Sequence, residues 1–583
     1  MNRRKKHSRN PRLLETLEPR QLLSATFLNA IGFGTSSDYG EAISSMATDS
    51  AGNIIVAGYF QGTMDVDPSA GVHNITSNGS YNYDMFLIKY TAAGNLLWVK
   101  TFDSPGNEMA AGITVDASDH IMLTGSFTGT LDMDPGAGVS NIISNGDVDA
   151  LVAKLDSSGN LIWAKSYGGT AWDDATKIVS DNQGGFLLIG NFQGTADLDP
   201  GVGVHNATTS GLGGVYMTHI DSAGDLIWSD QFTATNNMWI ANLAVDNAGN
   251  IYAAGSMQGT FDADPSPHAK FLGNGNHLLA FVAKFNSNGK LSWAKQFGQG
   301  TDGTFVYDMT RDADGNLILV GSFGGSGDFD PGPRMKTLTE HQSPDAFTGY
   351  VMKLNSNGGF KWAGPLLGDW WSDAYAVTTD ASDNIYVTGE INGTNTLDIT
   401  GTGNDTLTSR GQDDAFLAKY DPAGHVAWVE QMGSPTYDHG LRVVLGPGST
   451  LYASGYFSTT AHFGPLNAGV DLTALGNQDS FIAIFDQSPA TPTATLAAVQ
   501  DSSVLGRRAT FTATVAPAQG IATGFVVFKD GTKVIGRVKL DDNGHAVLHK
   551  RGIKTGVHHI TVSYDGDENF LAVTSVIVDL NVV

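Results

Sequence analysis

The chain has 583 residues, of which 72 are glycine, none is cysteine, 41% are hydrophobic and only 16% are charged. This composition excludes a coiled coil and a disordered chain, and the lack of cysteine excludes disulfide bonds and thiolate metal sites. The net charge of −26 disfavours binding to nucleic acid or anionic membranes, and no apolar run is long enough for a transmembrane segment.

The N-terminal segment, residues 1–24, is basic, whereas the rest of the chain is not. It holds seven basic and two acidic residues, while residues 25–489 hold 17 basic and 49 acidic ones. Glu15, Glu18 and Arg20 interrupt its apolar stretch, so it lacks the core of an ordinary secretory signal. Leu-Glu-Pro-Arg-Gln-Leu-Leu at 17–23 resembles the N-terminal motif of large exported proteins of planctomycete-type bacteria. The resemblance implies export, and the alternative is a disordered basic tail.

A repeat of about 65 residues fills the region 25–487. Its clearest mark is a series of tryptophans, spaced 65 to 69 residues apart: Trp98, Trp163, Trp228, Trp293, Trp362 and Trp428. Turns of the form Asp-x-x-Gly-Asn separate alternating apolar runs, and glycine supplies the positive φ that hairpin turns need. The first repeat predicts strands at 42–48, 54–60, 85–90 and 96–102. Four strands per repeat are typical of a β-propeller blade.

The first turn of the repeat occurs seven times, which predicts seven blades. It lies at Asp49, Asp116, Asp181, Asp246, Asp312, Asp380 and, in degenerate form, at 446–448. The seventh repeat lacks a fourth strand. Residues 26–33, in contrast, read as a fourth strand that is not preceded by the first three strands of a repeat. Aligning Phe33 with Phe102 places Asn29 where Trp98 stands. We therefore expect residues 26–33 to complete the last blade and close the ring.

The repeat also resembles a known family. The phrases Asp-x-x-Gly-Asn-Ile, Gly-Thr-x-Asp-x-Asp-Pro, Asp-x-Phe-x-x-Lys and Gly-Asn-Leu-x-Trp are similar to those of the bacterial seven-bladed β-propeller (SBBP) repeat. That resemblance implies extracellular or surface bacterial proteins, mostly without an assigned activity. The same phrases resemble the tryptophan-docking motif of quinone-dependent dehydrogenases, so a quinoprotein-like propeller is a minor alternative. We expect the repeat tryptophans to pack against neighbouring blades.

Five repeats carry an Asp-x-Asp pair before proline in the long connection between the second and third strands. The pairs are Asp65 and Asp67, Asp132 and Asp134, Asp197 and Asp199, Asp262 and Asp264, and Asp328 and Asp330. Paired carboxylates suit Ca²⁺, which takes six to eight oxygen ligands. Aspartate before proline is also a common turn former. Turn formation is the favoured interpretation, and Ca²⁺ is the one cofactor that the pattern suggests.

The loops that lead into each innermost strand contain acidic and aromatic residues that are not part of the repeat pattern. These residues are Glu41, Glu108, Asp173, Asp438, Trp172, Trp239 and Trp371, with Phe305, Trp370 and Tyr437 nearby. Loops on a rigid scaffold often carry function, so this mouth of the funnel is the predicted binding site. Packing between blades and capping of backbone groups are the alternative interpretation.

A second domain is expected after a linker at 488–492. In residues 493–583 the tryptophans and the 65-residue period disappear. Alternation at 509–515 and the Asp530-Gly531 turn predict a small β-sandwich. The stretches 524–531, 558–564 and 565–570 resemble the bacterial Ig-like repeats of surface proteins, which are spacers or adhesive units.

The sequence thus predicts an all-β chain, a seven-bladed β-propeller of four-stranded blades followed by an Ig-like β-sandwich. It contains neither His-Glu-x-x-His nor Gly-x-Ser-x-Gly, and its histidines do not cluster at metal-ligand spacing. We therefore expect an exported, monomeric scaffold at the cell surface or outside the cell that binds a glycan or a protein. An extracellular propeller enzyme acting on polysaccharide, as a hydrolase or lyase, is the alternative. Two funnel carboxylates beside an open, aromatic-lined cleft would favour the enzyme.

Overall fold

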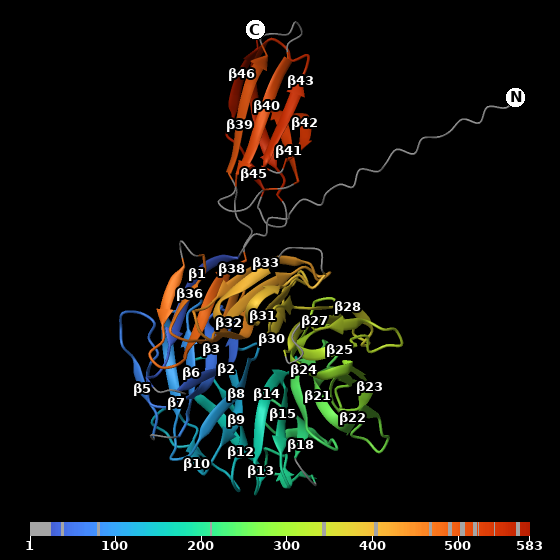
Figure 1. Ribbon diagram of the computed structural model, residues 1–583. Coiled ribbons are helices and arrows are strands. Elements are labelled where there is room, and N and C mark those ends of the chain that lie inside the picture. Colours follow the sequence, from blue (N-terminus) through green and yellow to red (C-terminus); the bar gives the residue numbers. More distant parts are fainter. Residues whose placement is uncertain are drawn as a thin grey trace, which may run out of the picture. The chain divides into compact units, whose positions relative to one another are not determined.

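The computed structural model describes residues 25–36, 40–78, 82–209, 213–340, 346–400, 406–465, 469–487, 493–501, 508–516, 522, 524–541, 543–566 and 572–582. The basic N-terminal segment 1–24 and the linker 488–492 lie outside these residues. Every regular element of the described residues is a strand (Figure 1). The chain divides into two compact units, one comprising Ser24–Ser488 and the other including Pro489–Val583.

In the described residues of the larger unit, each of seven antiparallel sheets contains four main strands. The first four sheets contain β2 (Glu41–Thr48), β3 (Ile54–Phe60), β6 (Asp84–Tyr90), β7 (Leu96–Phe102); β8 (Glu108–Val115), β9 (Ile121–Phe127), β12 (Asp149–Leu155), β13 (Leu161–Gly169); β14 (Asp173–Ser180), β15 (Phe186–Phe192), β18 (Gly214–Ile220), β19 (Leu226–Phe232); and β20 (Met238–Val245), β21 (Ile251–Asp262), β22 (Phe271–Phe285), β23 (Leu291–Phe297). The last three contain β24 (Gln299–Arg311), β25 (Leu317–Asp328), β27 (Thr348–Leu354), β28 (Phe360–Pro365); β30 (Ser372–Thr379), β31 (Ile385–Thr396), β32 (Thr406–Tyr420), β33 (Val426–Met432); and β34 (His439–Leu445), β35 (Thr450–Phe457), β38 (Asp479–Asp486), β1 (Thr26–Phe33).

The sheets lie around a common centre, as Figure 1 shows. The first strand of each sheet is innermost and contacts the first strand of the next, and β34 contacts β2 in turn. The third strands β6 and β12 are buried along their whole length, because each sheet is covered on both faces by its neighbours. This arrangement is a β-propeller.

Strands from the two ends of the larger unit pair within the last sheet, which packs against the first. β1 pairs antiparallel with β38, from Thr26 opposite Asp486 to Phe33 opposite Ser480. Phe33 is 4% exposed and packs into the core between the last sheet and the first. Thr48 Oγ1 also donates a hydrogen bond to the carbonyl oxygen of Leu445, at 3.0 Å. The last sheet therefore contains four strands, and its third strand, β38, is paired on both sides.

The aspartate of the first turn joins that turn to the third strand of the same sheet. Asp49 Oδ1 accepts a hydrogen bond from the Asn53 amide at 2.8 Å, and its Oδ2 lies 2.8 Å from Lys89 Nζ. The same ion pair recurs as Asp116–Lys154, Asp181–His219, Asp246–Lys284 and Asp312–Lys353. These contacts explain why Asp-x-x-Gly and Asp-x-Phe-x-x-Lys recur together.

Five of the repeat tryptophans pack on a turn of the next sheet: Trp98, Trp163, Trp228, Trp293 and Trp362. A Cβ added to Gly224, where φ is +78°, would lie 2.7 Å from Cη2 of Trp163, so glycine serves both the turn and the close approach. The indole of Trp163 donates to the carbonyl oxygen of Ser222 at 3.3 Å. At the ring closure Asn29 of β1 takes this place, and its amide donates to the carbonyl oxygen of Ala93 at 3.4 Å.

The long connections contain short strands that the sequence analysis did not predict. In several sheets they form two-stranded ribbons or extend the neighbouring strands. They are β4 (Thr63–Asp65), β5 (Asn74–Thr76), β10 (Thr130–Asp132), β11 (Asn141–Ile143), β16 (Thr195–Asp197), β17 (Asn206–Thr208), β26 (Thr337–Thr339), β36 (Thr460–Phe463) and β37 (Val470–Thr473). A further short strand, β29 (Leu367–Gly368), lies between β28 and β30 and pairs with β31.

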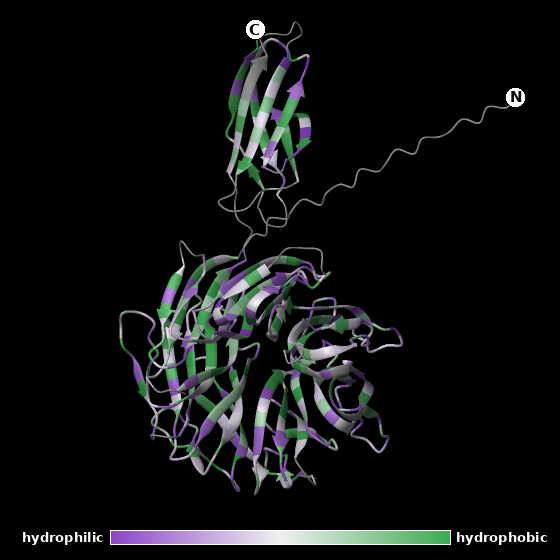
Figure 2. Ribbon diagram, in the orientation of Figure 1, coloured by the Kyte–Doolittle hydropathy of each residue, from purple (hydrophilic) through white to green (hydrophobic). Residues whose placement is uncertain are grey.

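The C-terminal unit is a β-sandwich of two sheets around a core that includes Phe511, Phe528 and Val562. Buried and partly exposed residues alternate along β40, and Figure 2 shows this alternation of hydrophobic and hydrophilic residues along its strands. The strands are β39 (Thr493–Asp501), β40 (Arg508–Ala516) and β43 (His545–Lys550) in one sheet, and β41 (Phe525–Asp530), β42 (Lys533–Lys539), β44 (Gly556–Tyr564), β45 (Val573–Thr574) and β46 (Val578–Val582) in the other.

Candidate binding site at the rim of the propeller

The four predicted acids at the mouth bind backbone or hydroxyl groups of nearby loops. Glu41 accepts a hydrogen bond from the Thr35 amide at 3.0 Å, and the Ser104 hydroxyl donates to Glu108, which is fully buried. Asp173 accepts from the amides of residues 169 and 193, and Asp438 from those of residues 434 and 458. These contacts match the capping interpretation of the four acids.

Two of these acids face a second carboxyl group. Burial, and then the charge of Asp479, raises the pKa of Glu41 to about 8. Burial and the charge of Asp84 likewise raise the pKa of Glu108 to about 7, against the opposing hydrogen bond from Ser104. Within the described residues, Glu108 Oε2 and Asp84 Oδ1 are buried and receive no hydrogen bond. Glu41 therefore favours the protonated form at neutral pH, and Glu108 is about half protonated there.

Exposed aromatic rings lie one or two residues before the inner strand in three of the sheets. Trp172 is 37% exposed, Trp371 39% and Tyr437 44%. Backbone bridges to the preceding sheet hold two of them: Trp172 pairs with Val148, and Tyr437 with Asp413, both in parallel orientation. The rings are therefore presented on a rigid backbone rather than on a long loop.

A row of half-buried rings crosses the inner side of four neighbouring sheets. The successive ring centroids lie 4.4 to 6.2 Å apart. The row consists of Trp239, Phe305, Tyr307, Tyr375, His439 and Tyr456. It ends among acidic side chains between the sixth and seventh sheets.

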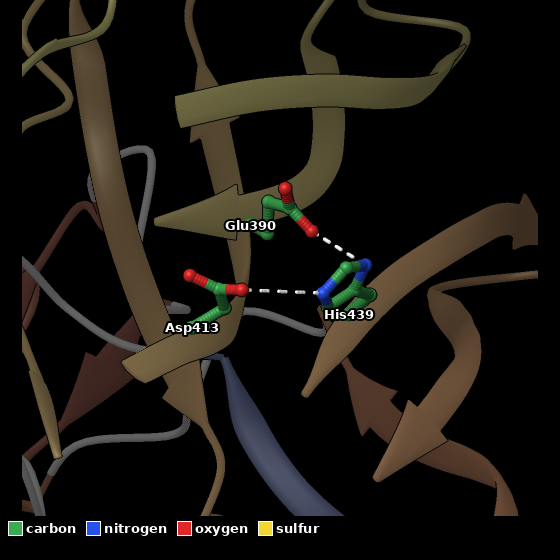
Figure 3. Close-up of side chains that lie close together, drawn as sticks. All are labelled: Glu390, Asp413 and His439. Carbon is green, nitrogen blue, oxygen red and sulfur yellow. Dashed lines mark ion pairs between the residues drawn. The ribbon is translucent and has the colours of Figure 1, made fainter. Parts of the chain in front are cut away.

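There Glu390 of β31, Asp413 of β32 and His439 of β34 form an acid–histidine cluster (Figure 3). His439 Nδ1 lies 2.5 Å from Glu390 Oε2, and its Nε2 lies 3.6 Å from Asp413 Oδ2. One ligand-type atom from each residue lies within 4.8 Å of the other two. Among the residues that the structure describes, this is the one group of three or more side chains so arranged.

Neighbouring side chains fix the cluster. Asp413 Oδ1 accepts hydrogen bonds from Trp371 Nε1 at 3.1 Å and from Asn392 Nδ2 at 2.7 Å. The Tyr456 hydroxyl lies 2.6 Å from His439 Nδ1. Burial alone would lower the pKa of His439, but the neighbouring carboxyl groups of Asp413 and Glu390 raise it to about 9. Burial and the charge of Glu390 raise the pKa of the adjacent Asp373 to about 7.

The structure thus brings only part of the predicted mouth together. Trp371 touches the cluster and Trp239 begins the row of rings, whereas Trp172 lines a separate pocket of about 120 Å³ beside Met238. Trp239 also lines a cavity of about 220 Å³ with Lys177, whose pKa burial and the charge of Arg442 lower to about 8.

The sequence analysis missed the cluster itself. A signal was present in the second strand of the sheets, which contains a glycine. The residue after this glycine is serine or asparagine in four sheets, at 126, 191, 256 and 322. Glu390 breaks that pattern, and His439 directly follows the predicted Asp438.

The Asp-x-Asp pairs organise the turns of the long connections. Asp197 Oδ1 accepts hydrogen bonds from the amides of Asp199 at 3.1 Å and His205 at 2.7 Å. Asp199 Oδ1 accepts one from the Gly201 amide at 2.7 Å. The other four pairs repeat this pattern. One oxygen of each carboxylate is therefore already engaged by the backbone.

Two family models match the chain. Residues 496–583 match the bacterial Ig-like domain (group 3), and residues 227–259 match a beta-propeller repeat. Together with the strand arrangement, these matches confirm the predicted all-β fold of a propeller with SBBP repeats and an Ig-like domain. No helix in the described residues is long and apolar enough to cross a membrane.

Among curated proteins, an uncharacterized WD repeat-containing protein, L264, of Acanthamoeba polyphaga mimivirus is 23% identical over 71% of this chain and 35% of its own length. The regulatory protein FlaEY of Caulobacter vibrioides is 24% identical over 37% of this chain and 22% of its own length. The chain thus spans about a third of the first relative and less of the second.

Among solved structures, Sqt1 from Chaetomium thermophilum is 8% identical, with a TM-score of 0.38, over 80% of this chain and all of its own. A protein of unknown function from Dyadobacter fermentans is 11% identical, with a TM-score of 0.34, over 79% of this chain and 98% of its own.

Proposed function

We propose that the protein is an exported binding scaffold whose propeller rim holds an extracellular glycan, while the Ig-like domain spaces or tethers it. The observation that carries the proposal is the exposure of Trp371 and Tyr437 beside Asp413. A backbone bridge to Asp413 holds Tyr437, and the indole of Trp371 donates a hydrogen bond to the carboxylate of Asp413. Five of the six repeat tryptophans, in contrast, pack on glycine turns of the next sheet. Bacterial Ig-like domains and propeller repeats are common in extracellular proteins, which supports the location.

The state of the rim acids favours binding over hydrolysis. A glycosidase needs two carboxyl groups that reach the substrate. Glu108, Asp173 and Asp438 are each at most 1% exposed and bind nearby loops. The accessible chemistry of the rim is therefore aromatic, and flat rings beside polar groups suit a neutral sugar or an apolar peptide side chain.

Removal of the rim rings should weaken this binding. We expect Tyr437→Ala and Trp371→Ala each to reduce affinity about tenfold for glycans first found on an array, since each loses an aromatic contact of about 1.4 kcal/mol. The measurement is calorimetry with the isolated glycan. Phe271→Ala is the matched control, because this ring is 64% exposed but lies on β22. Equal affinity in all three variants, or a failure of every glycan to bind, would refute the rim as a sugar site.

Calcium binding by the Asp-x-Asp pairs stays a separate proposal with its own test. Because Asp197 Oδ1 already accepts two amide hydrogen bonds, we expect Asp197→Asn to be tolerated and Asp197→Ala to lower stability by about 1 kcal/mol. Thermal unfolding with millimolar Ca²⁺ and with EDTA tests whether the pairs bind calcium. A rise of several degrees with Ca²⁺ that disappears when the aspartates of all five pairs are changed to asparagine would establish calcium ligands, since an ion bound only by the native state must stabilise it.

A further inference from the structure

We propose that the acid–histidine cluster binds one divalent transition-metal ion, with zinc as the best fit. His439 would supply a nitrogen ligand, and Asp413 and Glu390 carboxylate oxygens. The inference goes beyond the proposed function, because metal binding at the cluster does not depend on glycan binding at the rim.

The distances within the cluster suit such an ion. The 3.6 Å between His439 Nε2 and Asp413 Oδ2 is too long for a hydrogen bond. It is close to the roughly 3.3 Å that separates two ligands with bonds of about 2.0–2.1 Å at a tetrahedral angle. All three residues offer an atom within 4.8 Å of the other two. One nitrogen with two carboxylate oxygens fits zinc and its neighbours better than calcium or magnesium, which prefer oxygen alone.

The surrounding hydrogen bonds orient these atoms as metal sites require. Trp371 and Asn392 both donate to Asp413 Oδ1, which leaves Oδ2 directed at the histidine. The Tyr456 hydroxyl lies 2.6 Å from His439 Nδ1, the same nitrogen that pairs with Glu390, and so helps to fix the orientation of the ring. Outer partners that hold a ligand in place in this way are a regular feature of metal centres.

The charges around the histidine also call for a cation. Three carboxyl groups, those of Asp373, Glu390 and Asp413, surround the single imidazole. Glu390 and Asp413 are 4% and 3% exposed. Glu390 Oε2 pairs with His439 Nδ1 at 2.5 Å, whereas Asp373 Oδ1 is buried and accepts no hydrogen bond within the described residues. Buried negative charge without full compensation is costly, and a divalent ion would compensate it.

The test uses the full chain, freed of metal by a chelator and titrated with Zn²⁺ alone. We expect one equivalent to bind by calorimetry and elemental analysis, and the unfolding temperature to rise. His439→Gln should lose at least 100-fold in affinity, and Asn392→Ala, which removes only an orienting group, about tenfold. His462→Gln is the matched control, since His462 pairs with Asp471 on the β36–β37 ribbon of the same repeat, and it should bind as the unaltered chain does.

Two results would overturn the site. One is less than a tenth of an equivalent of zinc on the unaltered chain. The other is equal affinity in His439→Gln, Asp413→Asn and the unaltered chain. If His439→Gln does not fold, cobalt bound to the unaltered chain decides: a tetrahedral absorption spectrum supports the site, and an octahedral one refutes it. Tyr437→Ala should keep the metal, so that failure of glycan binding and failure of metal binding are separate outcomes.

Discussion

At pH 5 the propeller is expected to resist unfolding more strongly than at pH 8. Glu108 is fully buried and its folded pKa is raised from 4.5 to about 7. A carboxyl group with a raised folded pKa contributes stability that is present below the unfolded pKa and is lost as the pH rises through the folded value. Glu41, raised to about 8, acts in the same direction, and so does His439, raised to about 9. The window is therefore about pH 4.5 to 9.

Replacement of Glu108 by glutamine isolates one of these groups. We expect Glu108→Gln to be more stable than the unaltered chain at pH 8 by about 1–2 kcal/mol, and to lose part of the difference between pH 5 and pH 8. Tryptophan fluorescence in urea measures this in the propeller alone, because all ten tryptophans lie between residues 98 and 428. Exposed Asp314→Asn is the control. The explanation fails if Glu108→Gln and the control show the same dependence on pH.

The second large effect is expected at the ring closure. Phe33→Ala should lower the free energy of unfolding by about 3–5 kcal/mol, because its ring is 4% exposed in the core between the last and first sheets. Leu28→Ala in the same strand is the control, since Leu28 is 54% exposed and should change stability by less than about 0.5 kcal/mol. Urea unfolding compares the two variants.

Deletion of residues 25–33 tests the closure as a whole. Without β1, the strand β38 becomes an open edge with unpaired backbone groups. We expect this chain to aggregate, as measured by light scattering and size-exclusion chromatography. A deleted chain that stays monomeric and as stable as the full one would show that β1 does not close the ring.

The fold was readable from the sequence because each repeat is held by local contacts with a fixed spacing. In five sheets the turn aspartate pairs with a lysine or histidine of its own sheet, and five tryptophans pack on the turn of the next sheet, so both recur about every 65 residues. The short ribbons were missed because strands of three residues, such as β4 and β5, are too short to show an alternation of apolar and polar residues.

The site was less predictable, because it depends on side chains from three strands that only the ring brings together. Residues 390, 413 and 439 are 23 and 26 positions apart, far from the spacing of a local metal motif. The sequence located Glu108 and Asp173 at the start of inner strands, but not the burial that makes them caps. Burial depends on the neighbouring sheet, which no single repeat specifies.

The pairing of β1 with β38 also sets an order in time. More than 440 residues separate Phe33 from Asp479, and a ribosome adding about 5–20 residues per second needs roughly 20 to 90 seconds to make them. During that interval the first strand made has no partner, while the sheets that follow it pair locally as they emerge. Any chain that stops short of β38 leaves the nascent N-terminal strand unpaired, so this pairing distinguishes a finished propeller from a partial one.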